Sequence, residues 1–465
     1  MPPLSYQALL QKTCQLATEF LGGLEARPAA RMVDVSALLD GAGGPLPHEG
    51  EDPAGVIAYL AKSVDAGLTA SAGPRYFGFV TGGSVPAALA ADWLTSAWDQ
   101  NGFNYTSSPA AAALEAIAAR WLIELLGLAP HTGVGFTTGC TMSNFTALAA
   151  ARHALLAKLG WDVETQGLFG APPVAVVTSE ESHMTIFAAL QMLGFGRNRV
   201  TQIPTDSQGR MRVEELRSAL RNIDRPALVC AQAGNVNTGA FDPLPEISDC
   251  VRASSGWLHV DGAFGLWAAA SPAYRELTRG IEHADSIASD CHKWLNVPYD
   301  SGLVFVRDAV SHRAAMTLSA AYYGQPPQEV RDNYNWVPES SRRARGFVVY
   351  AALRSLGRRG VMEMIERCCA LARRMRDQLS RGTDVQILNE VVLNQLLVRF
   401  GDSDQLTGAV IERVQQDGTC WAGPTMWRGM KAMRVSVSNW STSEADIDLS
   451  AAAVLRCAHA GAAAV

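Results

Sequence analysis

Short apolar runs alternate with helix-length amphipathic stretches through the middle of the chain, between about residues 74 and 345. The clearest apolar runs lie at 174–178, 227–231, 257–260 and 303–306. Runs of this length, separated by helical patterns, are typical of an α/β sheet that is mostly parallel and has helices on both faces. We therefore predict such a sheet for the middle of the chain.

The two ends of the chain follow other patterns. The first 74 residues predict helices joined by a loose segment rich in Gly and Pro at 41–53. After residue 345, a long helical stretch at 347–379 precedes two apolar runs, at 391–400 and 433–437. We therefore expect three parts, which are an N-terminal helical segment (1–74), a large α/β domain (75–345) and a small C-terminal α+β domain (346–465).

One connection in the large domain has a different composition. Residues 324–336 are rich in Pro, Gln, Asn and Asp, which predicts an exposed loop. Such a loop could be a mobile lid over a nearby site or an ordinary surface connection. Composition alone favours neither.

Composition and charge narrow the class of protein. The chain has 465 residues, of which 48% are hydrophobic and 18% charged, as in globular proteins of more than one domain. The net charge of −6, without a block of like charges, argues against nucleic acid as a partner. No apolar run reaches the roughly 20 residues that span a bilayer, and the N-terminus lacks a secretory signal pattern.

The nine cysteines are scattered, and no C-x-x-C occurs. This pattern argues against a disulfide framework and against a zinc or other metal site, and it predicts a cytoplasmic protein.

Lys293 is the first residue that indicates chemistry. It stands between His292 and Trp294, before a largely apolar stretch at 295–306. A partly buried lysine is costly unless it is paired or used. One use is as an amine of lowered pKa that forms a Schiff base with an aldehyde cofactor. The alternative is a lysine whose stem packs on Trp294 while its ammonium reaches water.

Asp261 ends the apolar run 257–260 and is followed by Gly262 and Ala263. Ligands of parallel sheets bind beyond the carboxyl ends of strands. A carboxylate there suits the protonated ring nitrogen of pyridoxal 5′-phosphate (PLP), and the small residues leave space for a flat ring. A capping or turn aspartate is the other interpretation.

Two further segments fit the same cofactor. The small, hydroxyl-rich turn 136–144 opens a helix predicted at 145–159, and a helix start favours a phosphate, although simple capping explains the turn equally well. His183 follows the run 174–178 and could stack on a ring or be structural. A phosphate turn, a ring stacker, a pyridinium partner and a Schiff-base lysine thus follow one another, each beside a predicted strand end.

At these residues the chain resembles the PLP-dependent group II decarboxylases, whose members include aromatic-L-amino-acid, histidine and glutamate decarboxylases. The resemblance runs from about Tyr76 to the C-terminus. The matching segments are Ser108-Pro109-Ala110 with Leu114-Glu115, His259-Val260-Asp261-Gly262-Ala263, Asp285-Ser286 through His292-Lys293-Trp294, and Ser341-Arg342-Arg343-Ala344-Arg345. The resemblance implies PLP fold type I, with an aspartate-aminotransferase-like large domain, and a homodimer with shared active sites.

The resemblance also implies a role for each site residue. Lys293 holds PLP, Asp261 pairs with its ring nitrogen, and Ala263 and His183 lie on opposite faces of the ring. The residues implied near the phosphate are Gly139, Cys140, Thr141, Asp290 and His292. On a mobile loop, Tyr322 matches the tyrosine that protonates the carbanion, with Tyr323 beside it as an alternative.

The chain departs from the family pattern at three places. Gly234-Asn235-Val236-Asn237 stands where many members have Gly-Thr-Thr, and we expect Asn235 near the cofactor. Asp290 replaces a more usual asparagine, and Gly139-Cys140 lacks a hydroxyl. These changes affect substrate identity more than cofactor binding.

The predicted reaction is α-decarboxylation of an L-amino acid to an amine and CO2. The alternatives are another PLP-dependent lyase, an oxidative aldehyde synthase, which Tyr322 disfavours, and a catalytically silent PLP-binding protein. Aromatic residues at 76–79, Trp98 and Phe103 could line a pocket for an aromatic or bulky apolar amino acid, or could be core. No basic partner for the distal carboxylate of glutamate is identified.

Overall fold

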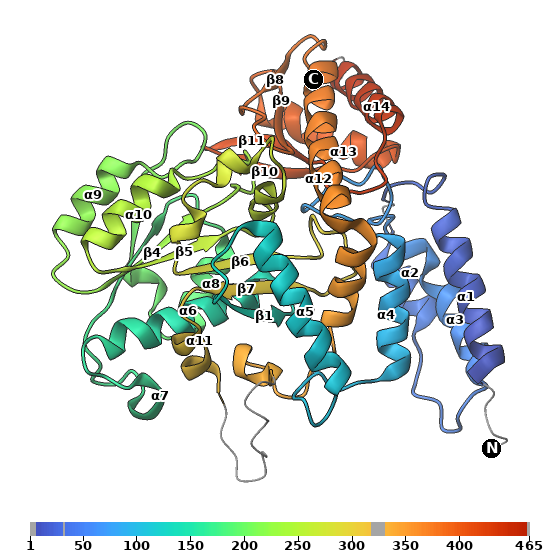
Figure 1. Ribbon diagram of the computed structural model, residues 1–465. Coiled ribbons are helices and arrows are strands. Elements are labelled where there is room, and N and C mark those ends of the chain that lie inside the picture. The colour runs from blue at the N-terminus through green and yellow to red at the C-terminus, as the bar shows by residue number, and fades with distance from the viewer. Residues whose placement is uncertain (1–5, 31–32, 318–330, 463–465) are drawn as a thin grey trace. The chain divides into compact units, whose positions relative to one another are not determined.

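The computed structural model describes residues 6–30, 33–317 and 331–462 (Figure 1). The chain forms two compact units. The small unit comprises Met1–Thr81, Arg374–Leu388 and Leu397–Val465, and the large unit comprises Gly82–Arg373 and Asn389–Leu396. The domain boundaries expected at residues 74 and 345 stay a prediction.

The large unit is built on a seven-stranded sheet of order β1-β7-β6-β5-β4-β2-β3. The five strands β6, β5, β4, β2 and β3, in this spatial order, pair in parallel, whereas β7 runs antiparallel to both β6 and β1. The predicted mostly parallel sheet is thus confirmed. Its strands are β1 (Gly133–Thr137), β2 (Ala175–Ser179), β3 (Val200–Ile203), β4 (Ala227–Gln232), β5 (Trp257–Asp261), β6 (Ser286–Asp290) and β7 (Gly302–Val306).

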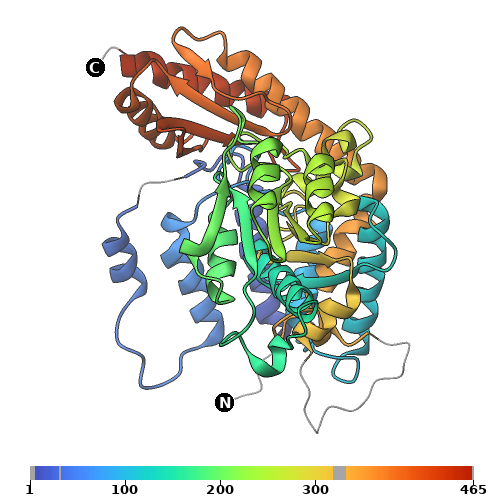
Figure 2. The same cartoon turned by 90° about the vertical axis from the view of Figure 1, so that its left-hand side faces the viewer.

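Helices lie on both sides of this sheet, with α9 and α10 on one side and α6 and α11 on the other (Figures 1 and 2). On the α6 side, Leu148, Ile186 and Met316 pack with Leu228 and Trp257 of the sheet. The helices of the unit are α4 (Pro86–Trp98), α5 (Pro109–Leu126), α6 (Cys140–Ala157), α7 (Val163–Gln166), α8 (Met184–Met192), α9 (Val213–Arg221), α10 (Leu244–Ala253) and α11 (Ala309–Met316).

Helix α6 begins at Cys140, five residues before the predicted start at 145. The usual start signals are missing because its N-cap is Gly139, which makes no side-chain capping bond. Strand β6 was not predicted either. Its sequence, Ser-Ile-Ala-Ser-Asp, contains few apolar residues, yet every residue of the strand is buried.

The end of the loop expected at 324–336 differs from the prediction. Residues 324–330 lie outside the described residues, but Asp332, Asn333 and Tyr334 are buried. Asn333 Nδ2 donates a hydrogen bond to Gly102 O, 3.2 Å away, and Tyr334 stacks on Phe103. The exposed-loop prediction is therefore wrong for this end, because its polar groups have partners in the unit.

The small unit contains the four-stranded sheet β10-β11-β9-β8. Its strands are β8 (Val385–Ile387), β9 (Gln395–Phe400), β10 (Gly423–Trp427) and β11 (Met430–Ser436), shown in orange to red in Figure 2. Its helices are α1 (Tyr6–Gly22), α2 (Val35–Ala42), α3 (Pro53–Val64), α13 (Asp404–Asp417) and α14 (Glu444–Ala462). Helix α12 (Gly346–Leu379) connects the units and is interrupted at Gly357.

Two further findings bear on the class of protein. Among the described residues, no helix is both long and apolar enough to cross a lipid bilayer. All nine cysteines carry free thiols, and eight of them are buried.

Candidate active site

The fold brings most of the predicted site residues together at the carboxyl ends of neighbouring strands. Asp261 ends β5 and Asp290 ends β6, and these strands pair in parallel with Asp261 opposite Ala288. The start of α6, directly after β1, reaches both carboxylates through Cys140. Residues far apart in the sequence therefore form one cluster.

Lys293 forms an ion pair with Asp290. Its Nζ lies 2.9 Å from Asp290 Oδ2, and the lysine side chain is 18% exposed. Burial on its own lowers the pKa of Lys293, but the neighbouring acidic groups, Asp290 foremost, raise it, and the balance puts the pKa at about 12. The expected lowered pKa is therefore wrong for this structure, because a buried carboxylate stabilises the ammonium.

Asp290 also forms a hydrogen bond with the first residue of α6. Its Oδ1 accepts a hydrogen bond from Cys140 N at 2.6 Å and lies 3.4 Å from His292 Nε2. Burial lowers the pKa of His292, although Asp290 opposes this. The imidazole is therefore neutral at pH 7, and its Nδ1 accepts a hydrogen bond from Ser301 N.

Gly139 is required by the backbone at this turn. Its φ of +153° is rarely adopted by residues with a side chain, and a Cβ would lie 3.2 Å from His292 Cε1. Thr141, two residues later in the first turn of α6, is exposed. The first turn of α6 thus exposes the side chain of Thr141 to solvent, directly after the turn at Gly139.

Asp261 is held by three donors. Its Oδ1 accepts from Ala263 N at 3.1 Å and from Cys140 Sγ at 3.4 Å, and its Oδ2 accepts from Asn144 Nδ2 at 3.3 Å. Burial, reinforced by Asp261 and Asp290, raises the pKa of Cys140 well above its usual value. Cys140 is therefore a neutral thiol that donates to the carboxylate.

His183 caps helix α8. Its Nδ1 accepts from Thr185 N at 3.4 Å and lies 2.8 Å from Thr185 Oγ1. Thr185 Oγ1 in turn accepts from Asn144 Nδ2 at 3.3 Å. The ring is half-buried, and the bond through Thr185 connects it to the same asparagine that holds Asp261.

Asn235 is buried, and its amide is used inside its own loop. Its Oδ1 accepts from Asn237 N at 2.9 Å and from Thr238 N at 3.2 Å, and its Nδ2 reaches Glu181 O at 3.5 Å. The expected contact between Asn235 and the cofactor stays a prediction. Tyr322 and Tyr323 lie outside the described residues.

Sequence reasoning missed two residues that the structure places in contact with the site. Asn144 lies four residues after Cys140, on the same face of α6, and His259 lies two residues before Asp261, on the same face of β5. Asn144 Oδ1 lies 2.9 Å from His259 Nε2. The four-residue spacing from Cys140 and the two-residue spacing from Asp261 were the features of the sequence that could have indicated these two residues.

The cluster fits the three functional groups of PLP. Asp261 is a buried carboxylate that suits a protonated ring nitrogen, Lys293 suits the aldehyde, and the glycine turn before α6 suits the phosphate. Asp290 is the one group of the wrong charge for a phosphate, but its ion pair with Lys293 offsets that charge.

Comparison with known proteins decides the family. The pyridoxal-dependent decarboxylase conserved domain matches residues 40–400. The chain belongs to the pyridoxal-dependent decarboxylase family. It is therefore a PLP-dependent amino-acid decarboxylase, and PLP is its cofactor, as the sequence predicted.

Relatives in this family act on different substrates. The chain is 28% identical to the aromatic-L-amino-acid decarboxylase of Bacillus atrophaeus, over 90% of this chain and 85% of that protein. It is 32% identical to the human acidic amino acid decarboxylase GADL1, over 68% of this chain and 61% of that protein. The crystal structure of Oryza sativa TDC with PLP and tryptamine shares the fold, with a TM-score of 0.92, 24% identity and 99% of each chain covered.

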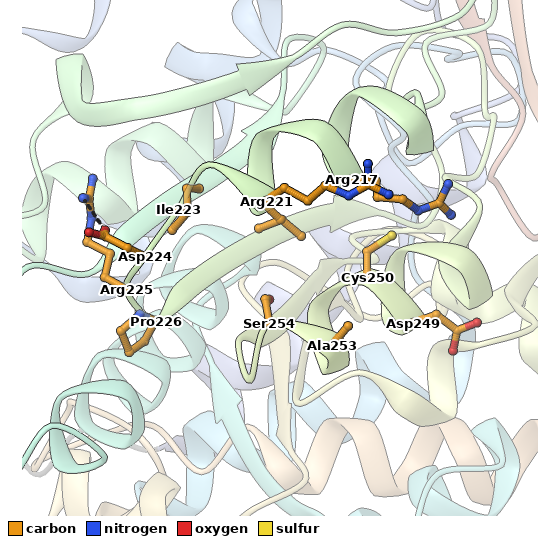
Figure 3. A pocket seen from close by; sticks show the side chains of 11 residues that line it. Arg217, Arg221, Ile223, Asp224, Arg225, Pro226, Asp249, Cys250, Ala253 and Ser254 are labelled. Carbon is orange, nitrogen blue, oxygen red and sulfur yellow. Dashed lines mark ion pairs between the residues drawn. The ribbon is translucent and has the colours of Figure 1, made fainter.

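A pocket of about 690 Å³ lies elsewhere in the large unit of this decarboxylase, between α9 and α10 (Figure 3). Its lining contains charges of both signs, including Arg225, which pairs with Asp224. None of its lining residues is a predicted site residue. Among the described residues, no group of three His, Cys, Asp or Glu side chains could hold a metal ion.

Proposed function

We propose that this decarboxylase removes the α-carboxyl group of an L-amino acid as CO2 and releases the corresponding amine, with PLP attached to Lys293. The observation that carries the proposal is the juxtaposition of Lys293, Asp290 and Asp261 at the ends of β5 and β6. A lysine amine and a buried carboxylate so placed match the aldehyde and the ring nitrogen of the cofactor.

When bound, PLP supplies an electron sink for the electron pair left on Cα as CO2 departs. Asp261 keeps the ring nitrogen protonated, because a fixed buried carboxylate stabilises a neighbouring cation. His183 would lie against the ring, and Gly139, Cys140 and Thr141 at the start of α6 would hold the phosphate. In this proposal, Asp290 holds the ammonium of Lys293 until the lysine takes up its cofactor.

The return of a proton to Cα completes the reaction. We assign this step to Tyr322, on the resemblance to the family alone, because a phenol can deliver a proton. Replacement of Tyr322 by Phe should divert turnover from the amine towards the aldehyde, ammonia and hydrogen peroxide, with dissolved dioxygen as the oxidant. An assay of amine, CO2 and peroxide together would detect this change.

We infer that the substrate is an aromatic or bulky apolar amino acid. The relative that is named for aromatic amino acids matches 90% of this chain, whereas the relative named for acidic amino acids matches 68%. We also infer a cytoplasmic homodimer with shared active sites, which light scattering of the purified protein would test for its oligomeric state.

The test is a screen of L-amino acids for CO2 release by the PLP-loaded protein. Tryptophan, tyrosine, phenylalanine and 3,4-dihydroxyphenylalanine are the expected substrates, and glutamate, aspartate and cysteine sulfinate are the comparison set. Lys293→Ala should abolish release and the visible absorbance of the bound cofactor. Release from the acidic set alone would overturn the substrate class, and silence on every amino acid with PLP bound would overturn the activity.

A further inference from the structure

A chain of buried hydrogen bonds leads from the core of the large unit to Asp261. Trp257 Nε1 donates to Ser286 Oγ at 2.9 Å, and Ser286 Oγ lies 3.0 Å from His259 Nδ1. His259 Nε2 lies 2.9 Å from Asn144 Oδ1, and Asn144 Nδ2 donates to Asp261 Oδ2 at 3.3 Å. All five residues are buried.

The chemistry of its two ends gives this chain one direction. The carboxylate of Asp261 can only accept, so the amide nitrogen of Asn144 faces it and the amide oxygen faces His259 Nε2. At the other end, the indole nitrogen of Trp257 can only donate, so the Ser286 hydroxyl accepts from it and has its own hydrogen left for His259 Nδ1. His259 therefore carries its proton on Nε2 and donates to the amide oxygen of Asn144. The opposite orientation of Asn144 would place an amide oxygen against the carboxylate of Asp261, two acceptors facing each other.

The histidine in this chain is neutral. Burial lowers the pKa of His259 to about 4, although Asp261 opposes this. A neutral imidazole places no positive charge beside Asp261, so the histidine does not compete with the ring nitrogen of the cofactor for the attraction of this carboxylate. The orientation of the Asp261 carboxylate is fixed by neutral donors.

Asn144 is also a branch point. The second hydrogen of its amide nitrogen reaches Thr185 Oγ1 at 3.3 Å, and that hydroxyl lies 2.8 Å from His183 Nδ1. One side chain thus connects Asp261 with His183. A shift of Asn144 would disturb both groups at once.

We propose that Asn144 and His259 are positioning residues for PLP. Asn144 holds the carboxylate of Asp261 and, through Thr185, the ring of His183. His259, oriented by Ser286, fixes the direction in which the amide of Asn144 points. The inference rests on the proposed role of Asp261 and adds the residues that orient it.

His259→Leu tests the chain, because leucine fills the space but leaves the amide oxygen of Asn144 without a donor. We expect the dissociation constant for PLP, measured by equilibrium dialysis, to rise about tenfold to a hundredfold. The visible spectrum of bound PLP should also change, because a poorly held carboxylate stabilises the protonated ring nitrogen less.

Two variants separate positioning from folding. His259→Gln can place an amide nitrogen where Nε2 lies, and it should restore PLP affinity to within about threefold of the original. Val260→Ala is the matched control, since Val260 is buried on the same strand with its side chain on the opposite face. It should lower the thermal stability of the apoprotein and leave PLP affinity and the spectrum unchanged.

The outcomes are distinct. Wild-type affinity and an unchanged spectrum in folded His259→Leu would overturn the positioning role while leaving the proposed function intact. If His259→Leu does not fold, Ser286→Ala takes its place. We expect a smaller rise of the dissociation constant for PLP in Ser286→Ala, and an unchanged dissociation constant would overturn the proposal. Failure of the unaltered protein to bind PLP would instead overturn the proposed function itself.

Discussion

The ion pair between Asp290 and Lys293 predicts that a single change of charge accelerates the attachment of PLP. Asp290→Asn keeps an oxygen that can accept from Cys140 N, now 2.6 Å from Asp290 Oδ1, and removes the charge 2.9 Å from Lys293 Nζ. The fold of the turn should therefore survive, while the ammonium of Lys293 loses its principal stabilising partner.

The magnitude follows from the pKa of the lysine. With a pKa of about 12, only about 1 in 30,000 molecules carries the neutral, nucleophilic amine at pH 7.5. Two unit charges 2.9 Å apart attract by at most about 6 kcal/mol at an effective dielectric constant of about 20. Opposite charges in proteins shift a pKa by about 1 to 3, so we expect a tenfold to thousandfold rise in neutral amine.

The assay is stopped-flow mixing of apoprotein with PLP at pH 7.5, followed by the visible absorbance of the attached cofactor. The maximal rate at saturating PLP should rise about tenfold or more in Asp290→Asn, because that rate is proportional to the neutral amine. Asp92→Asn is the control. It removes a negative charge from a different ion pair, the one with Arg343, and should leave the rate unchanged. A maximal rate in folded Asp290→Asn that equals or falls below that of the original would refute the reasoning.

Three further changes test buried charges and a backbone position in the large unit. Glu115→Gln breaks a fully buried ion pair with Arg342, and the free energy of unfolding in urea should fall by about 3 to 5 kcal/mol; a loss under about 1 kcal/mol would contradict this. Gly139→Ala should weaken PLP binding at least about tenfold in equilibrium dialysis, because of its positive φ and the contact with His292, and unchanged affinity would count against a required glycine. Burial lowers the pKa of His312 to about 3, so between about pH 6.5 and 4.5 the unfolded chain binds a proton that the folded chain does not. The free energy of unfolding in urea should therefore fall by about 2 kcal/mol over this range. His312→Gln should lose less stability over the same range.

Much of the site could be predicted from sequence because its residues follow strands with a clear apolar pattern. The run 257–260 marks β5, so Asp261 could be placed at the carboxyl end of a strand. Lys293 was recognisable because a charged side chain next to Trp294 is unusual. In both cases the chemistry lies within a few residues of the pattern that locates it.

The remaining features depend on contacts that no local pattern encodes. His259 and Asn144 are 115 residues apart and meet only because α6 crosses the face of the sheet to which His259 points. The raised pKa of Lys293 depends on a turn that brings Asp290, three residues earlier, against the ammonium. Strand β6 went unrecognised because its Ser and Asp side chains are buried with partners such as Trp257 Nε1, which only the assembled sheet supplies.

The attachment site of the cofactor is the most direct test of the whole account. Purified protein loaded with PLP, reduced with borohydride and digested, should show by mass spectrometry a single pyridoxyl adduct, on the peptide that contains Lys293. An adduct confined to another lysine, such as Lys158 or Lys431, or no adduct on protein that binds PLP, would contradict the account.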